Sequence, residues 1–117
     1  MTYNAFKGST VLITGHTGFK GAWLTAWLKE LGAKVVGIAL NPPTIPSHFD
    51  VANLAQDMTD FRIDIRNHAA LKDAIVSTQP DFVFHLAAQA LVRRSYEDPL
   101  ETWQINVLGT LHVLEAL

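Results

Sequence analysis

Apolar residues gather in four short runs along this chain, at residues 10–14, 34–40, 61–65 and 82–86. Compact apolar runs rich in β-branched residues are typical of strands that are buried on both faces of a parallel sheet. The third run alternates in polarity and predicts a short strand. Four strands are therefore predicted, connected by the helices and loops described next.

Two amphipathic helices are predicted between these strands. The first spans residues 19–31 and ends before Gly32, with apolar positions at Trp23, Leu24, Trp27, Leu28 and Leu31. The second follows an Asn67 N-cap and extends to about Thr78, with its inner face formed by Ala70, Leu71, Ala74 and Ile75. Segment 42–60 is predicted to be a loop that holds at most a short helix within residues 48–57. Segment 91–97 is predicted to be a polar connection.

A third, long helix begins after residue 98. Asp98 is placed as N-cap, Pro99 at the first helical position and Glu101 two positions later. One apolar side is formed by Leu100, Trp103, Val107, Leu108, Leu111 and Leu114. Ile105, Val113 and Leu117 lie elsewhere on the helix, which predicts a second covered face, such as a subunit interface. Asn106 and Gly109 are poor helix formers, and their presence indicates a local contact.

The order of these elements predicts the fold class. One helix and little else separates the first two strands, so they form a right-handed crossover with parallel strands. We expect an α/β fold, a Rossmann-type doubly wound parallel sheet that is incomplete, with strand order 3-2-1-4 and flanking helices. Because the apolar pattern continues to the last residue, residues 1–117 are expected to be the N-terminal part of a dinucleotide-binding domain. The rest of that domain and a substrate domain are expected outside this sequence.

Glycines recur every three residues directly after the first predicted strand, at Gly15, Gly18 and Gly21. Glycine leaves no Cβ between the backbone and a ligand, and the helix that follows offers free N–H groups to a phosphate. The turn is therefore predicted to seat the diphosphate of a dinucleotide. The alternative is a tight turn whose glycines serve packing alone. The spacing excludes a P-loop, because no Gly-Lys-Ser/Thr follows.

Two further segments are expected to face this turn. Ala87, Ala88 and Gln89 follow the fourth strand, which flanks the first at the point where the strand order reverses and ligands bind. Close helix packing is the alternative for the two alanines. Asn41 follows the second strand where an acidic ribose partner is expected, and an amide there has no charge to repel a 2′-phosphate. Asn41 is otherwise a simple turn residue.

Composition narrows the function classes. A formal charge of −2 gives no electrostatic reason to expect nucleic acid or an anionic membrane as partner, and the absence of cysteine excludes disulfides and thiol chemistry. The first nine residues form a lead-in without the apolar core of a secretion signal, so a cytoplasmic protein is expected. The five histidines lack metal-ligand spacing and no carboxylate partner is assignable to them. His85 is expected to be a satisfied core histidine. His16 lies within the glycine turn and is expected to be solvent-exposed, with contact to the diphosphate as the alternative.

Residues 14–21 (Thr-Gly-His-Thr-Gly-Phe-Lys-Gly), 84–97 and 106–110 resemble the extended short-chain dehydrogenases/reductases. The wider motifs are most similar to the members that dehydrate CDP-glucose. The resemblance implies a Rossmann domain that binds NAD, with Gly15, Gly18, Phe19 and Lys20 around the diphosphate and Ala87, Ala88 and Gln89 on the ribose and nicotinamide side. Together with the turn and strand-end residues His16, Thr17, Gly21 and Asn41, these are the expected cofactor contacts. Asp64 and Ile65 would flank the adenine. The helix from Pro99 would form a homo-oligomer interface.

The resemblance also implies an activity. The members it points to convert CDP-glucose to a 4-keto-6-deoxy sugar nucleotide by oxidation at C4, loss of water across C5 and C6, and hydride return to C6. Their catalytic Tyr-x-x-x-Lys pair is expected beyond residue 117, so residues 1–117 alone are expected to be inactive. An epimerase of the same fold and a non-catalytic dinucleotide sensor are the alternatives. Product analysis and the downstream sequence would separate them.

Overall fold

A computed structural model describes residues 5–117, so part of the predicted lead-in lies outside the described residues. In chain order the elements are β1 (Thr10–Thr14), α1 (Phe19–Glu30), β2 (Lys34–Ala39), α2 (His48–Val51), β3 (Thr59–Arg62), α3 (His68–Thr78), β4 (Phe82–His85), α4 (Val92–Glu97), α5 (Pro99–Trp103), the π-helical segment η2 (Gln104–Leu108) and α6 (Gly109–Ala116). None of the helices in this part of the chain is long and apolar enough to cross a membrane.

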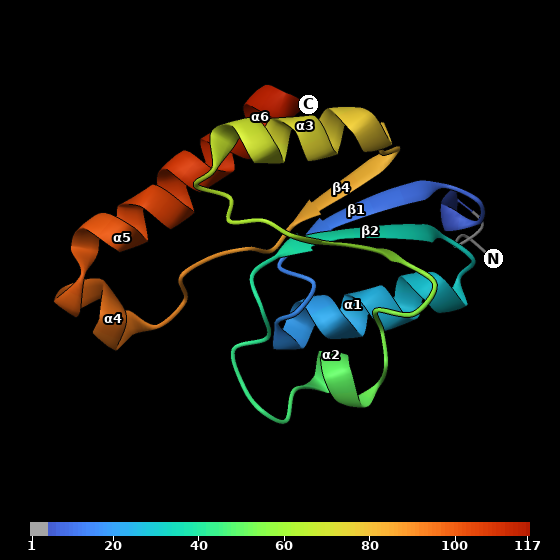
Figure 1. Ribbon diagram of the computed structural model, residues 1–117, viewed down its shortest axis with the longest axis horizontal. Helices are drawn as coiled ribbons and strands as arrows, with labels where there is room; N and C mark the ends of the chain where they lie inside the picture. The colour runs from blue at the N-terminus through green and yellow to red at the C-terminus, as the bar shows by residue number, and fades with distance from the viewer. Residues whose placement is uncertain (1–4) are drawn as a thin grey trace.

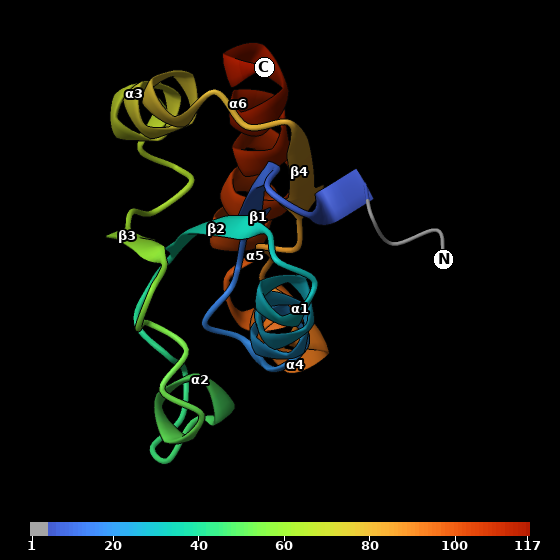
Figure 2. The ribbon, with the colours of Figure 1, turned by 90° about the vertical axis from the view of Figure 1, so that its right-hand side faces the viewer.

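The four strands form one parallel sheet in the order β3-β2-β1-β4, which confirms the predicted topology. Figure 2 shows α1 and α2 on one side of this sheet and α3 and α6 on the other. Val11, Ile13 and Val35 pack with Leu28 of α1. On the opposite face, the core comprises Leu12, Val36, Ile38, Ile65, Leu71, Ala74, Ile75, Val113 and Ala116. Both faces of β1 are thus buried, as its apolar run predicts.

Capping residues define the helix ends as the sequence predicts. The Asn67 side chain accepts a hydrogen bond from the Ala70 N–H, and Asp98 accepts one from the Glu101 N–H. Gly32 has a φ of +81°, the left-handed conformation suited to the residue after a helix. The long helix continues from α5 through η2 into α6, because the residues at both junctions keep right-handed helical torsions.

Three element predictions are wrong in detail. β3 ends at Arg62 and not at residue 65, because its partner β2 ends at Ala39 and the ladder stops there. Residues 92–97 form the helix α4, in which an Arg93–Glu97 ion pair spans one turn, and not a plain connection. Trp23 and Trp27 of α1 are more than half exposed, because small residues of α1, Gly21, Ala22 and Thr25, together with Leu28, form the buried side.

The long helix buries only part of the apolar surface that the sequence predicts. The buried side comprises Gly109, Val113 and Ala116, which pack toward α3, with Ile105 against the same core. The first predicted apolar side is exposed and comprises Leu100, Trp103, Val107, Leu108, Leu111 and Leu114. The smaller residues allow the closer approach of the helix to the core. We refer to the exposed set as the α5–α6 stripe.

Candidate functional site

A groove of about 250 Å³ opens at the carboxyl edge of the sheet, between the turn after β1 and the segment after β4. Both strands end there side by side, since Thr14 of β1 is paired in register with His85 of β4. The prediction that these segments face one crevice is confirmed. Predicted site residues that line the groove are Gly15, Thr17, Gly18, Asn41, Asp64, Ile65, Ala87 and Ala88.

The structure accounts for the three glycines of the turn in different ways. A Cβ on Gly21 would lie 2.0 Å from the carbonyl oxygen of Gly15, and a Cβ on Gly15 would lie 2.9 Å from the backbone nitrogen of Ala87. Both positions therefore require glycine for packing, and Gly15 also has a φ of +82°. A Cβ on Gly18 would meet only the Gly15 oxygen, at an ordinary 3.4 Å. Gly18 has a φ of −76°, so neither packing nor conformation requires glycine there.

Gly18 is the N-cap of α1, and no side chain caps this end of the helix. The first N–H groups of a helix have no partner within it, and the helix dipole favours an anion at this end. Since Gly18 lines the groove, its bare Cα and the start of α1 fit a phosphate group. The packing alternative is thus correct for Gly15 and Gly21 and incomplete for Gly18.

Thr14 connects the turn to the segment after β4. Its hydroxyl oxygen accepts hydrogen bonds from the N–H groups of Leu86 and Ala87, each at 3.1 Å, and lies 2.6 Å from His85 Nδ1. The hydroxyl therefore donates to Nδ1, and His85 Nε2–H donates to Thr110 Oγ1 at 3.0 Å. Burial lowers the pKa of His85. Both ring nitrogens of His85 are hydrogen-bonded, as predicted for a satisfied histidine, but the residue is only partly buried and does not belong to the core.

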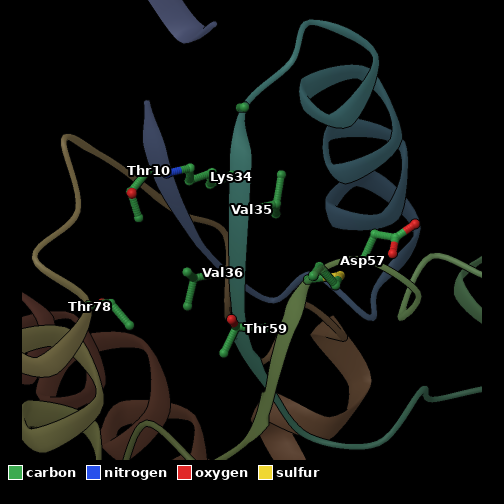
Figure 3. Close-up of a pocket in the computed structure, with 9 residues that line it drawn as sticks. Thr10, Lys34, Val35, Val36, Asp57, Thr59 and Thr78 are labelled. Carbon is green, nitrogen blue, oxygen red and sulfur yellow. The ribbon is translucent and has the colours of Figure 1, made fainter. Parts of the chain in front are cut away.

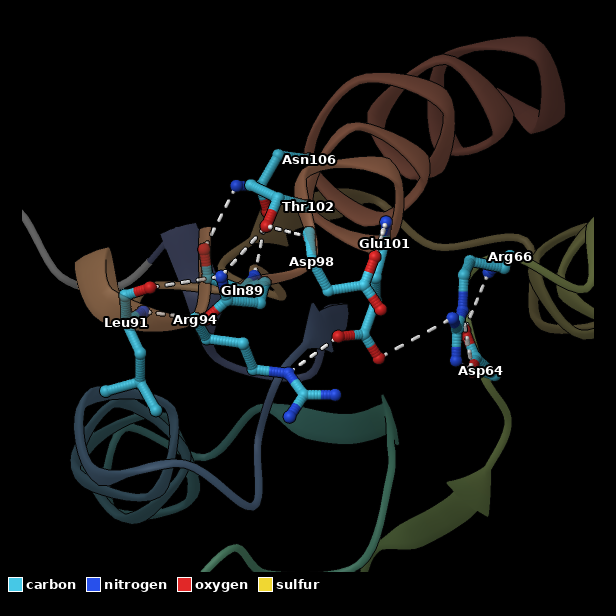
Figure 4. Close-up of polar contacts among 9 residues, drawn as sticks. All are labelled: Asp64, Arg66, Gln89, Leu91, Arg94, Asp98, Glu101, Thr102 and Asn106. Atoms are coloured by element: carbon cyan, nitrogen blue, oxygen red, sulfur yellow. Dashed lines mark hydrogen bonds and ion pairs between the residues drawn. The ribbon is translucent and has the colours of Figure 1, made fainter. Parts of the chain in front are cut away.

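Asn106 holds the segment after β4 from the opposite side (Figure 4). Its Oδ1 accepts from the Gln89 N–H at 2.8 Å, and its Nδ2 donates to the Gln89 carbonyl at 3.0 Å. The Gln89 side chain bonds Leu91 O and Thr102 Oγ1 and does not line the groove. A Cβ on Gly109 would lie 2.4 Å from Ile65 Cδ1. These contacts explain why two poor helix formers stand within the long helix.

Ion pairs border the groove on the side of α5 (Figure 4). The two carboxylate oxygens of Asp64 accept hydrogen bonds from Nε and Nη2 of Arg66, and these bonds hold the pKa of the Asp64 carboxyl below its usual range. Glu101 lies 2.6 Å from Arg94 and 3.8 Å from Arg66. Arg94 is therefore paired with a carboxylate in this structure.

His16 does not fit its prediction, because its side chain is completely buried. Its Nε2 lies 2.6 Å from Asp60 Oδ1, and its ring packs edge-on against Phe49. Burial lowers the pKa of His16, although the hydrogen bond and charge of Asp60 oppose this shift. The expectations that His16 is solvent-exposed and lacks a carboxylate partner are both wrong. The whole residue is shielded from solvent, and His16 is not among the residues that line the groove.

Gly37 lies outside the groove and makes room for His16, a contact that the sequence did not predict. A Cβ there would lie 2.3 Å from the His16 ring, so the imidazole occupies the space above β2 that a side chain at this position would fill. A glycine inside a strand pattern is the signal that could have revealed this contact. Phe19 and Lys20 are exposed at the first turn of α1, outside the lining of the groove.

Another hollow, of about 530 Å³, lies at the opposite edge of the sheet (Figure 3). Thr10, Lys34 and Thr59, the first residues of three strands, line it. It exists because β3 is short and its pairing with β2 begins only at Val36. In open α/β sheets, ligands bind at the carboxyl ends of the strands. The carboxyl edge, where the glycine turn lies, is therefore the candidate site, and the hollow at the opposite edge is not.

The sequence pattern of the GDP-mannose 4,6 dehydratase family matches residues 12–117, which include the glycine turn and every residue that lines the groove. The chain belongs to this family. Its resemblance to extended short-chain dehydrogenases/reductases is thereby confirmed. CDP-glucose 4,6-dehydratase of Salmonella typhimurium is 50% identical over 114 residues, which are 97% of this chain and 32% of that protein.

Solved structures of this fold agree with the family assignment. UDP-glucose 4-epimerase of Thermus thermophilus, in complex with NAD, has a TM-score of 0.81 and 33% identity, over 92% of this chain and 33% of the epimerase. UDP-glucose 4-epimerase of Thermotoga maritima, with UDP-glucose, has a TM-score of 0.81 and 29% identity over the same shares. The chain thus spans about one third of the length of the proteins it matches.

Proposed function

We propose that this chain is the cofactor-binding part of an NAD-dependent sugar-nucleotide 4,6-dehydratase that acts on CDP-glucose. The 50% identity with the Salmonella typhimurium enzyme, over nearly the entire chain, carries this proposal. The NAD complex of the epimerase with the same fold supports the cofactor. Residues 1–117 are accordingly the N-terminal part of a dinucleotide-binding domain, and the substrate domain belongs to the remaining length found in relatives.

The groove suits an extended dinucleotide because its two ends offer different chemistry. At the glycine turn, the start of α1 presents backbone N–H groups to the diphosphate, and Gly18 places no side chain between them and the ligand. Asp64 and Ile65 would flank the adenine, and Asn41 the adenosine ribose. Ala87 and Ala88 leave room beside β4 for the nicotinamide ribose. His16, Phe19, Lys20, Gly21 and Gln89, which do not line the groove, would support the site from its border.

Bound NAD would act as a reversible acceptor of a hydride from C4 of the sugar. The same hydride would be returned to C6 after loss of water across C5 and C6. The residues of this chain would bind and orient the cofactor. The Thr14–His85–Thr110 hydrogen bonds and the Asn106–Gln89 pair fix the segment after β4 against which the reacting end would lie. The proton-transfer residues are expected beyond residue 117.

A homo-oligomer is part of this proposal. The α5–α6 stripe exposes six large apolar side chains on one long helix, each at least 46% exposed. Contiguous apolar surface of this kind is typical of a protein–protein interface. A second copy of the full-length protein would cover it.

The full-length polypeptide, incubated with NAD and CDP-glucose deuterated at C4, tests the function. A dehydratase releases water and carries the deuterium to C6 of a 4-keto-6-deoxy product. The similarity to UDP-glucose 4-epimerases makes epimerisation the second candidate, and an epimerase would return the deuterium to C4 without loss of water. Binding of NAD with no change in any sugar nucleotide would favour a sensor and overturn both.

A further inference from the structure

The ribose end of the groove carries an amide whose orientation is fixed by its neighbour. Arg62 Nη1 donates to Asn41 Oδ1 at 2.8 Å. A guanidinium has only donors, so the amide oxygen must face Arg62. The N–H groups of Asn41 are therefore the polar atoms left for a ligand. Because Asn41 lines the groove, a ribose there would meet a donor in place of the usual carboxylate.

Arg62 is held in place next to this amide. Its Nε and Nη2 each donate to Asp60 at 3.0 Å, and its guanidinium carbon lies 5.5 Å from the centre of the Phe49 ring. With the bond to Asn41, three of its five N–H groups are used, and two remain for a ligand. The side chain is 33% exposed. A phosphate beside Asn41 could thus be reached without breaking an existing bond of Arg62.

The acidic groups Asp60 and Asp64 are each held by a basic partner. Asp60 is paired with Arg62 and also accepts a hydrogen bond from the buried His16. Burial alone would raise the pKa of Asp60, but the bonds from Arg62 and His16 outweigh it and lower that pKa, so Asp60 is ionised. Asp50 attracts Arg62 more weakly, and Asp64, the acid that lines the groove, is paired with Arg66.

We propose that Asn41 and Arg62 allow the adenosine ribose to carry a 2′-phosphate, so that this protein binds NADP as well as NAD. This inference rests on the proposed function. An acid at the position of Asn41 would accept the 2′-hydroxyl and repel a phosphate, whereas a nearby arginine accommodates it. Here the acid is absent and the arginine is fixed beside the site, which makes Asn41 and Arg62 the residues that determine cofactor specificity.

Calorimetric titration of the full-length polypeptide with NAD and with NADP tests this assignment. We expect dissociation constants for the two cofactors within about tenfold of each other. Arg62→Gln should weaken NADP about ten- to hundredfold, the loss expected for a hydrogen bond to a charged group, and change NAD less than about threefold. Asn41→Asp should weaken NADP by a similar factor and leave NAD bound. Lys72→Gln, which removes an exposed cation on α3, is the matched control and should change neither.

The outcomes are distinct. NAD binding with NADP more than a hundredfold weaker would overturn the inference and leave the proposed function intact. Binding of both cofactors with equal loss, or no loss, in Arg62→Gln and Asn41→Asp would overturn the assignment to these residues. Failure of both cofactors to bind the natural protein would refute the proposed function itself. Circular dichroism of each variant confirms that the fold is retained.

Discussion

Replacing each of two glycines in the same turn by alanine separates ligand binding from packing. Gly18 and Gly21 stand three residues apart at the start of α1, and the chemical change is identical at both positions. If Gly18 faces the cofactor diphosphate, Gly18→Ala should lose NAD affinity while the fold stays intact. Gly21→Ala should instead lose stability.

The distances give the expected size of each effect. At Gly21 the new methyl would lie 2.0 Å from the Gly15 oxygen and 2.8 Å from His16 Cα, and both atoms are backbone. Relief requires the turn to move, and such overpacking costs about 1–3 kcal/mol or more. At Gly18 the methyl makes an ordinary 3.4 Å contact. A weaker N-cap costs up to about 1 kcal/mol, which the reduced entropy of the unfolded chain offsets by about 0.4–1 kcal/mol.

The loss of affinity in Gly18→Ala follows from the ligand that the methyl displaces. A hydrogen bond between a backbone N–H and a charged phosphate contributes about 1.5–3 kcal/mol, so its loss weakens binding about ten- to hundredfold. Urea unfolding of the full-length protein measures stability, and calorimetric titration with NAD measures affinity. Unchanged NAD binding in Gly18→Ala would show that the phosphates lie elsewhere. Destabilisation equal to that of Gly21→Ala would show that Gly18 also serves packing.

Three further predictions concern the residues around the groove. Because burial lowers the pKa of His16, the unfolded chain gains a proton that the folded chain does not, so the free energy of unfolding should fall as pH drops below about 6.5. His16→Gln should reduce the slope of this free energy against pH between about pH 7.5 and 5.5, and the slope that remains is due to His85. An unchanged slope in His16→Gln would contradict this prediction. Asn106→Leu should cost about 2–4 kcal/mol in urea unfolding, since it leaves both backbone groups of Gln89 without their partner, and a cost below about 1 kcal/mol would show that solvent replaces the amide. Leu108→Asp in the α5–α6 stripe should dissociate the full-length oligomer in sedimentation experiments, whereas Val76→Asp on the exposed side of α3 should not, and an unchanged sedimentation coefficient in Leu108→Asp would refute the interface.

The sequence alone determined the sheet and the ends of most helices. In runs such as residues 10–14 the buried central residues Val11, Leu12 and Ile13 are all apolar, and this property depends on local composition rather than on any distant partner. Asn67, Asp98 and Gly32 mark helix ends because capping uses groups within a few residues. The glycine spacing also indicated where the groove would open, because strand order fixes the crevice at the carboxyl ends of β1 and β4.

Tertiary structure decided which side of each helix is buried and what each polar residue contacts. Both α1 and the long helix are apolar on more than one side, so their period could not show that Ala22 and Val113 face the sheet while Trp27 and Leu108 do not. The His16–Asp60 and Asn41–Arg62 contacts join residues 44 and 21 positions apart. Such contacts arise only when parallel strands bring distant segments together, because a side chain and its distant partner share no local pattern in the sequence.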